Sequence, residues 1–198
     1  MSWSILSDRE IRELCERQPP MITPFVPRQE GKPSYGLGSF GYDLRLGNKF
    51  LVPLGGVNAV LDPVDFPSEH FREIAIEPSS SHASRVTRHG IFELAPHSQV
   101  LAESVEWFHM PEDVMGVCWG KSSYARCGLL VNVTPLEPGW VGRLTIELAN
   151  LSPLPIRLHV GQGIAQVVFF RGRRPQRAYH EKEAGGRYQD QPGVTLPR

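Results

Sequence analysis

The 198-residue sequence carries no net charge and contains few cysteines. Its 21 basic side chains are matched by 21 acidic ones, which argues against a broad surface for nucleic acid but allows a local basic pocket. Cys15, Cys118 and Cys127 are an odd number of cysteines without paired spacing. We therefore expect buried, reduced thiols and a cytoplasmic protein with no nucleic-acid partner.

Long apolar runs are also missing. No run approaches the roughly 18 residues that a membrane-spanning helix needs. The N-terminal sequence MSWSILSDRE has neither the basic segment nor the long apolar segment of a secretion signal. The sequence therefore predicts no membrane partner.

The residue spacings of common metal sites are absent as well. The seven histidines are scattered, without H-x-H or H-x-x-x-H, and no two cysteines are close together. Zinc nucleobase deaminases carry H-x-E and P-C-x-x-C, and neither pattern occurs here. We expect no metal-binding site in the chain.

Glycine and proline are abundant, with 19 and 18 residues that separate short apolar runs. This pattern is typical of an all-β protein, and the length favours one domain over residues 1–198. Ser7 and Glu10 form a capping box, which predicts a short N-terminal helix within residues 1–20. The polar, basic residues 171–198 are predicted to form a tail or lid.

The alternation from Tyr42 to Leu46 is typical of a half-buried strand. Asp43 and Arg45 would share its polar face, and we interpret Arg45 as one half of a cross-strand ion pair. The polar run at 79–84 is predicted to be an exposed loop, with no assigned role.

The residues that could bind a ligand or catalyse a reaction are concentrated between Val117 and Leu148. An apolar run is followed by a glycine, Lys121, two serines and Arg126. The cations and hydroxyls could bind an anion, and the glycine would let backbone amides approach it. Further along, Thr145 and Glu147 share one face of a predicted strand, because strand side chains alternate. The residues alone leave two interpretations open, an anion-binding site or a β-hairpin with a solvated charged turn.

The letters GKSS at 120–123 do not form a P-loop. That motif requires G-x-x-x-x-G-K-[ST] followed by a helix. Met115 occupies the position of the first glycine, Gly116 is one residue late, and Gly128 would end a helix too soon. We therefore reject a P-loop.

The central stretch resembles the central block of the bacterial dCTP deaminases, which are relatives of the trimeric dUTPases. This resemblance implies a mainly β fold, a distorted antiparallel β-barrel or jelly roll of dUTPase-like type, with a short N-terminal helix. It covers nearly the whole chain in the expected order. The matching segments are SYGLGSFGYDLRLGNKF (34–50), GKSSYARCGLLVNVTPLEPGWVGRLTIEL (120–148), GIAQVVFF (163–170) and RYQDQPGVTLPR (187–198).

The resemblance also implies an activity and an assembly. Members of this family hydrolyse dCTP to dUTP and ammonia, which supplies dUTP for dUMP and dTTP synthesis. A homotrimer with sites between subunits is implied, as is dTTP as a feedback inhibitor. No cofactor is implied for the chemistry, and Mg²⁺ would accompany the triphosphate as a counter-ion.

Glu147 matches the catalytic glutamate of the family. One carboxylate can act in turn as general base and general acid. The alternative interpretation is a strand glutamate paired with a neighbouring cation. Ser122 and Arg126 match residues close to the chemistry that a neighbouring subunit provides. The further positions that the resemblance assigns to nucleotide binding are Lys121, Ser123, Tyr124, Ala125, Glu137, Thr145, Ile146, Gln166, Tyr179, Arg187 and Gln191.

Three other functions remain open. A bifunctional enzyme would release dUMP, and a dUTPase-like pyrophosphatase would need a carboxylate, such as Glu137 or Asp43, aimed at water near the α-phosphate, together with Mg²⁺. Trp140 argues against a simple dUTPase, because it stands where a tyrosine would stack on the base. A nucleotide-binding module without activity would have no need of Glu147.

Overall fold

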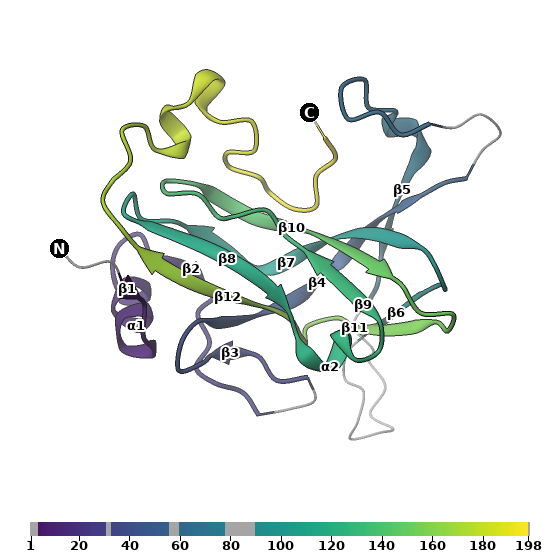
Figure 1. The fold of residues 1–198 in the computed structure, drawn as a ribbon, viewed down its shortest axis with the longest axis horizontal. Helices are drawn as coiled ribbons and strands as arrows, with labels where there is room; N and C mark the ends of the chain where they lie inside the picture. Colours follow the sequence, from purple (N-terminus) through teal and green to yellow (C-terminus); the bar gives the residue numbers. More distant parts are fainter. Residues whose placement is uncertain (1–3, 31–32, 56–59, 78–89, 198) are drawn as a thin grey trace.

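The computed structural model describes residues 4–30, 33–55, 60–77 and 90–197 and shows a mainly β protein (Figure 1). In these residues, ten strands form one curled sheet with antiparallel pairing between its named strands, and two more form a small antiparallel sheet. The predicted mainly β fold class with a short helix is confirmed. The elements are β1 (Ser4–Ile5), α1 (Asp8–Glu16), β2 (Ile22–Thr23), β3 (Gly36–Leu37), β4 (Tyr42–Pro53), the 3₁₀ turn η1 (Ser68–His70), β5 (Phe71–Ala75), β6 (Ile91–Leu94), β7 (Gln99–His109), β8 (Val114–Gly120), α2 (Ser122–Ala125), β9 (Leu129–Asn132), β10 (Val141–Asn150), β11 (Ile156–His159), β12 (Gly163–Arg171), and the 3₁₀ turns η2 (Tyr179–Glu181) and η3 (Glu183–Gly185).

The long strand β4 links the two halves of the curled sheet. Its first part pairs with β12, where Tyr42 lies opposite Val167, and its second part pairs with β7, where Phe50 lies opposite Ala102. The register shifts on both sides, between Gly163 and Ala165 on β12 and between Leu46 and Phe50 on β4. Such irregularities increase the local twist of a strand, which lets the sheet curl around its own interior.

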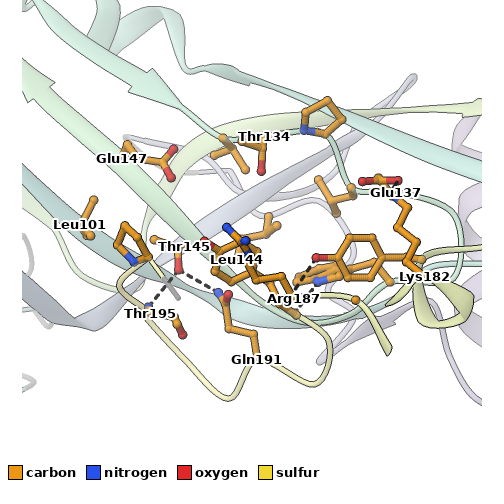
Figure 2. A pocket seen from close by; sticks show the side chains of 18 of the residues that line it. Leu101, Thr134, Glu137, Leu144, Thr145, Glu147, Lys182, Arg187, Gln191 and Thr195 are labelled. Carbon is orange, nitrogen blue, oxygen red and sulfur yellow. Dashed lines mark hydrogen bonds and ion pairs between the residues drawn. The ribbon is translucent and has the colours of Figure 1, made fainter. Parts of the chain in front are cut away.

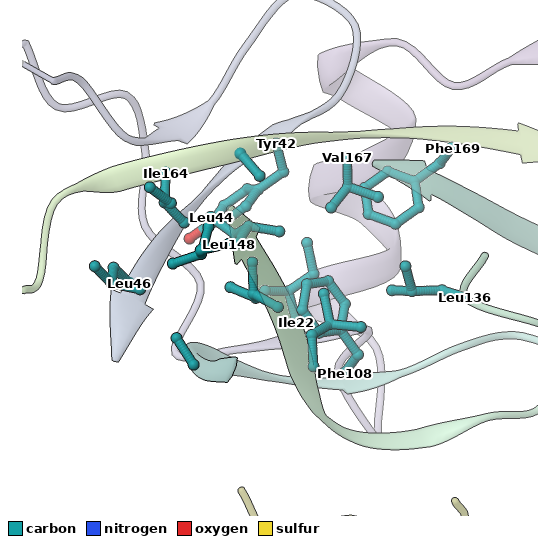
Figure 3. Close-up of a cluster of buried hydrophobic side chains, with 14 of the residues drawn as sticks. Ile22, Tyr42, Leu44, Leu46, Phe108, Leu136, Leu148, Ile164, Val167 and Phe169 are labelled. Atoms are coloured by element: carbon teal, nitrogen blue, oxygen red, sulfur yellow. The ribbon is translucent and has the colours of Figure 1, made fainter. Parts of the chain in front are cut away.

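The interior of the curl is filled by apolar side chains from opposite strands. Leu44, Phe108 and Ile164 are fully buried there, and Figure 3 shows side chains from β4, β7 and β12 gathered into one cluster. The β10 side chains Ile146 and Leu148 are buried as well. This core fixes β10 against its neighbours and turns the intervening side chains, Thr145 among them, to the other face.

The N-terminal helix α1 forms as predicted. The Ser7 main-chain N–H and hydroxyl both donate to the Glu10 carboxylate, at 3.0 and 2.9 Å. Ile11 and Leu14 bury the apolar face of the helix. Among the described residues, no helix combines the length and the apolar character needed to cross a membrane.

Two expectations about burial are wrong. The strand from Tyr42 to Leu46 is covered on both faces, because Arg28 and Lys121 cover the carboxylate of Asp43, which is only 4% exposed. Cys127 is exposed rather than buried, since it follows the exposed end of α2.

The ion pair predicted for Arg45 is confirmed. Arg45 Nε on β4 lies 2.7 Å from Oε1 of Glu106 on the neighbouring strand β7, and the Glu106 carboxylate is fully buried. The exposed loop predicted at 79–84 lies outside the described residues.

Candidate active site

The largest group of predicted nucleotide contacts lines one cavity. This cavity has a volume of about 760 Å³ and lies between β10, the loop before it and the C-terminal residues 179–197 (Figure 2). Its size suits a small-molecule ligand. We call it the Glu147 cavity; the predicted site residues that line it are Glu137, Thr145, Glu147, Tyr179, Arg187 and Gln191.

Glu147 is placed by β10 between two neighbouring strands. It lies opposite Asn132 of β9 and Leu101 of β7, and its carboxylate Oε2 accepts a hydrogen bond of 3.1 Å from Asn132 Nδ2. Burial raises the pKa of Glu147, while hydrogen bonds from its own main chain and from Asn132 act in the opposite direction. The result is a half-buried carboxylate whose neutral form is favoured more than in an exposed glutamate.

The C-terminal residues are held on the face of β10 next to Glu147. Gln191 is buried, and its Nε2 donates to Thr145 Oγ1 and to the Arg143 carbonyl, both at 2.8 Å. Thr145 Oγ1 also accepts from the Thr195 main-chain N–H at 3.0 Å. Figure 2 shows Thr145 as the point where both bonds converge. The chain end therefore closes one side of the cavity through a residue two positions from Glu147.

A second anchor lies under the end of this tail. The Glu103 carboxylate on β7 is buried and accepts from the Val194 main-chain N–H at 3.2 Å. Burial raises the pKa of Glu103, and the bond from Val194 opposes that shift. The tail is thus attached to both central strands, β7 and β10.

The tail is expected to loosen when its contact at Gly186 is disturbed. A Cβ at Gly186, which has a φ of +84°, would come within 2.8 Å of the Tyr179 carbonyl and 2.5 Å of its ring. Gly185 has a similar φ of +74°, but a Cβ there would meet nothing within 4 Å. We predict that Gly186→Ala weakens tail docking by about 1–2 kcal/mol more than Gly185→Ala, because only the first adds a steric clash to the backbone strain.

Limited trypsin cleavage after Arg187 measures this difference. When opening and closing are fast, cleavage follows the population of the open tail, so Gly186→Ala should be cut about tenfold faster than Gly185→Ala. Equal rates for the two variants would contradict the packing of Gly186 against Tyr179.

Glu137 faces the Glu147 cavity but is already engaged. Its carboxylate forms an ion pair with Lys182, whose ammonium also lies 5.0 Å from the centre of the Tyr179 ring. The Tyr179 hydroxyl accepts from the Tyr188 main-chain N–H at 3.0 Å. Glu137 is therefore attached to the tail rather than aimed freely into the cavity.

A second cavity, of about 900 Å³, contains other predicted site residues. Lys121, Ser122 and Gln166 line it. Oδ2 of the buried Asp43 lies 2.7 Å from Lys121 Nζ and 2.6 Å from Arg28 Nη1, so one carboxylate holds two cations at the cavity wall. We call this the Lys121 cavity. Arg12, Asp8 and Glu30 line this cavity as well, so its lining contains as many acidic as basic side chains. Glu147 does not line it but lines the first cavity.

The short helix α2 leaves most of its predicted site residues open to solvent. Ser122, Ser123, Ala125 and Arg126 are exposed, and Arg126 lines neither cavity. Tyr124 is buried, and its hydroxyl accepts from the His159 main-chain N–H at 3.1 Å.

The side chain of Ile146 is also buried, in the core. Only the main chains of Tyr124 and Ile146 could therefore reach a ligand. Among the described residues, no group of three or more histidine, cysteine, aspartate or glutamate side chains is arranged to hold a metal ion.

Three residues that contact the site carboxylates were not found from the sequence. Asn132 contacts Glu147, Lys182 contacts Glu137, and Arg28 contacts Asp43. Each contact joins segments that are distant along the chain. The register of β9 and β10, which places Asn132 opposite Glu147, is the signal that could have found the first of them.

The fold is shared with a known structure. The chain matches the crystal structure of 2′-deoxycytidine 5′-triphosphate deaminase from Agrobacterium tumefaciens with a TM-score of 0.62 and 20% sequence identity. The match covers 87% of this chain and 49% of that one, so the chain spans about half the length of that structure. The fold class is therefore that of a dCTP deaminase structure.

The sequence comparisons give the family. A family model described as dCTP deaminase-like matches residues 5–172. The dCTP deaminase of Gluconobacter oxydans (strain 621H) is 44% identical over 196 residues, and that of Anaplasma phagocytophilum (strain HZ) is 45% identical over 198 residues. Each comparison covers 98% of both chains. The chain belongs to the dCTP deaminase-like family, which confirms the predicted resemblance.

Proposed function

We propose that the protein hydrolyses dCTP to dUTP and ammonia, and that Glu147 is its general base and general acid. The observation that carries the proposal is the half-buried Glu147 carboxylate on the wall of a cavity of about 760 Å³, in a member of the dCTP deaminase-like family. A carboxylate whose pKa is raised by burial can exchange a proton near neutral pH more readily than an exposed one.

The reaction requires one proton acceptor that later becomes a donor. Ionised Glu147 takes a proton from water as the water oxygen bonds to C4 of the cytosine ring. Glu147 returns this proton to the ring nitrogen N3. It then takes the proton of the new C4 hydroxyl and donates it to the amino group, so that the C4–N bond breaks, ammonia leaves and a carbonyl remains at C4. The products, dUTP and ammonia, contain all atoms of dCTP and water, and Glu147 ends in its starting state.

The proposal needs no catalytic metal. It is supported by the missing zinc-deaminase motifs of the sequence, because the proton transfers can be assigned to one carboxylate. Mg²⁺ is proposed to accompany the triphosphate and to neutralise part of its charge.

A homotrimer is proposed to bring the two cavities together. Met115 and Trp119 share a face of β8 and are 38% and 52% exposed, and Leu130 on β9 is 52% exposed. Large apolar side chains on neighbouring strands favour coverage by another subunit. The strand β8 leads directly into α2, so a second copy of the chain on this face would be placed beside Ser122 and Arg126. These two residues are proposed to complete the Glu147 cavity of the neighbouring subunit.

The occupied carboxylates favour deamination over pyrophosphate release. A pyrophosphatase would need Asp43 or Glu137 to orient a water molecule near the α-phosphate. Asp43 is paired with Lys121 and Arg28, and Glu137 is paired with Lys182. Glu147, in contrast to Asp43 and Glu137, is held by the neutral amide of Asn132.

The products of dCTP test the proposal directly. Purified protein incubated with dCTP and Mg²⁺ is expected to release dUTP and ammonia in equal amounts, measured by ion-exchange chromatography and an ammonia assay. A zinc chelator that spares Mg²⁺ should not lower the rate. Added dTTP is expected to raise the apparent KM, as a feedback inhibitor that competes for the same cavity.

Other products would identify the alternatives. Ammonia together with dUMP and pyrophosphate would show the bifunctional enzyme. Pyrophosphate from dUTP without ammonia from dCTP would show a dUTPase. Triphosphate binding without any turnover would show a binding module, and each of these results would overturn the proposal as stated.

A further inference from the structure

Among the described residues, Asn132 is the only one whose side chain forms a hydrogen bond with the Glu147 side chain. Neither the family resemblance nor the sequence motifs assign a role to Asn132. It is the last residue of β9 and lies directly opposite Glu147 in the antiparallel pair of β9 and β10. Its Nδ2 donates to Glu147 Oε2 at 3.1 Å. The Asn132 side chain is exposed on the cavity side of the sheet, so the core does not require an amide at this position.

We propose that Asn132 is a positioning residue for deamination, and this rests on the proposed function of Glu147. Its amide holds Oε2 of the Glu147 carboxylate, so that the second oxygen, Oε1, is the one that exchanges a proton with water and the base. A fixed carboxylate is aligned before the substrate arrives, and alignment of this kind contributes directly to the rate.

The neutral charge of the amide is important for the two roles of Glu147. A hydrogen bond to the charged form favours ionisation and opposes the effect of burial. A cation at position 132 would favour ionisation so strongly that Glu147 would become a poor acid, and a carboxylate would have the reverse effect. An amide donor balances the two requirements without adding charge.

The side chains of the neighbouring strands add no charge next to Glu147, so Asn132 is the neighbour that adjusts the pKa of its carboxyl group. Leu101 on β7 is apolar, and Cys118 on β8 stays a neutral thiol because burial raises the pKa of Cys118 to about 12. The charged side chains that line the same cavity belong to the preceding loop and the tail. They are Glu137, Lys182, Glu183 and Arg187.

The pH dependence of kcat distinguishes positioning from a structural role. Asn132→Leu keeps the approximate size and removes the donor, so the pKa of Glu147 should rise and the acid limb of the profile should move to higher pH by about one unit. Below that limb, kcat should fall about tenfold, with KM within about twofold of the wild type. Asn132→Asp should move the limb further, because it adds a like charge, and Asn132→Gln should restore part of the wild-type profile.

A measurement that does not depend on activity separates this inference from the proposed function. The carboxyl ¹³C signal of Glu147, assigned by its loss in Glu147→Gln, can be titrated in the full-length protein and in Asn132→Leu. A higher titration midpoint in Asn132→Leu supports the contact even if the wild-type protein releases no ammonia, which would be a failure of the proposed function alone. An unchanged midpoint and an unmoved acid limb would overturn the role of Asn132.

Discussion

Replacing Glu147 by glutamine is expected to lower kcat for dCTP deamination by about 10³-fold, because an amide cannot take a proton from water or return it. The substitution keeps the size of the side chain and an oxygen that can accept from Asn132 Nδ2. The KM for dCTP should therefore change by no more than a few fold. Ammonia release under single-turnover conditions measures the chemical step, and equilibrium binding of dCTP shows whether the cavity remains intact.

Glu93→Gln is the matched control for this variant. Glu93 is an exposed carboxylate on β6 that pairs with Arg157 and lines neither cavity. Its replacement should leave kcat unchanged. If Glu147→Gln lost less than about tenfold, Glu147 could not be the group that transfers the protons.

The titration of Glu147 should also determine the pH dependence of kcat in the wild-type protein. Because burial raises the pKa of Glu147, its ionised form is lost as the pH falls through a value above that of an exposed glutamate. The acid limb of kcat should follow that value and should be absent from the residual activity of Glu147→Gln.

The face of β10 that carries the site could be predicted because strand alternation is a local property. Ile146 and Leu148 enter the core, and Thr145 and Glu147 line the cavity, as the sequence indicates. The capping box of α1 is equally local, since Ser7 and Glu10 are three residues apart. Neighbouring residues decide these features, so their pattern is readable in the sequence.

The partners of the site carboxylates could not be predicted in the same way. Asp43 is buried because an arm from Arg28 folds back over it, and Glu137 is paired because the tail returns with Lys182. These contacts depend on how distant segments meet after folding. Hydrophobic periodicity reports only the local environment of a segment and does not show which distant segment will pack against it. A charged residue that becomes buried between two such segments is therefore predicted to be exposed.

The position of Arg126 outside the Glu147 cavity of its own chain has a consequence for mixed oligomers. Glu147 lines this cavity, while Arg126 directly follows α2, is exposed and does not line the cavity in the same chain. If Arg126 serves the Glu147 of a neighbouring subunit, Arg126→Ala should lower kcat by at least about a hundredfold on its own, through lost stabilisation of developing charge. A trimer formed from Arg126→Ala and Glu147→Gln chains would nevertheless contain intact sites.

Co-expression of these two variants in equal amounts is expected to restore about one quarter of the wild-type activity per site, because a cyclic trimer joins each Glu147 to the Arg126 of the next subunit. In a random mixture, about one quarter of the sites combine an intact Glu147 with an intact Arg126. The matched control combines Glu147→Gln with Gln191→Ala, whose positions line the same cavity of one chain, and it should show no more than the sum of the two separate variants. Activity that stays at background in the first mixture, despite confirmed mixed trimers, would mean that each site is built within one subunit. Restored activity would instead require Arg126 to act across the interface, and it would explain why this exposed arginine lies outside the cavity of its own chain.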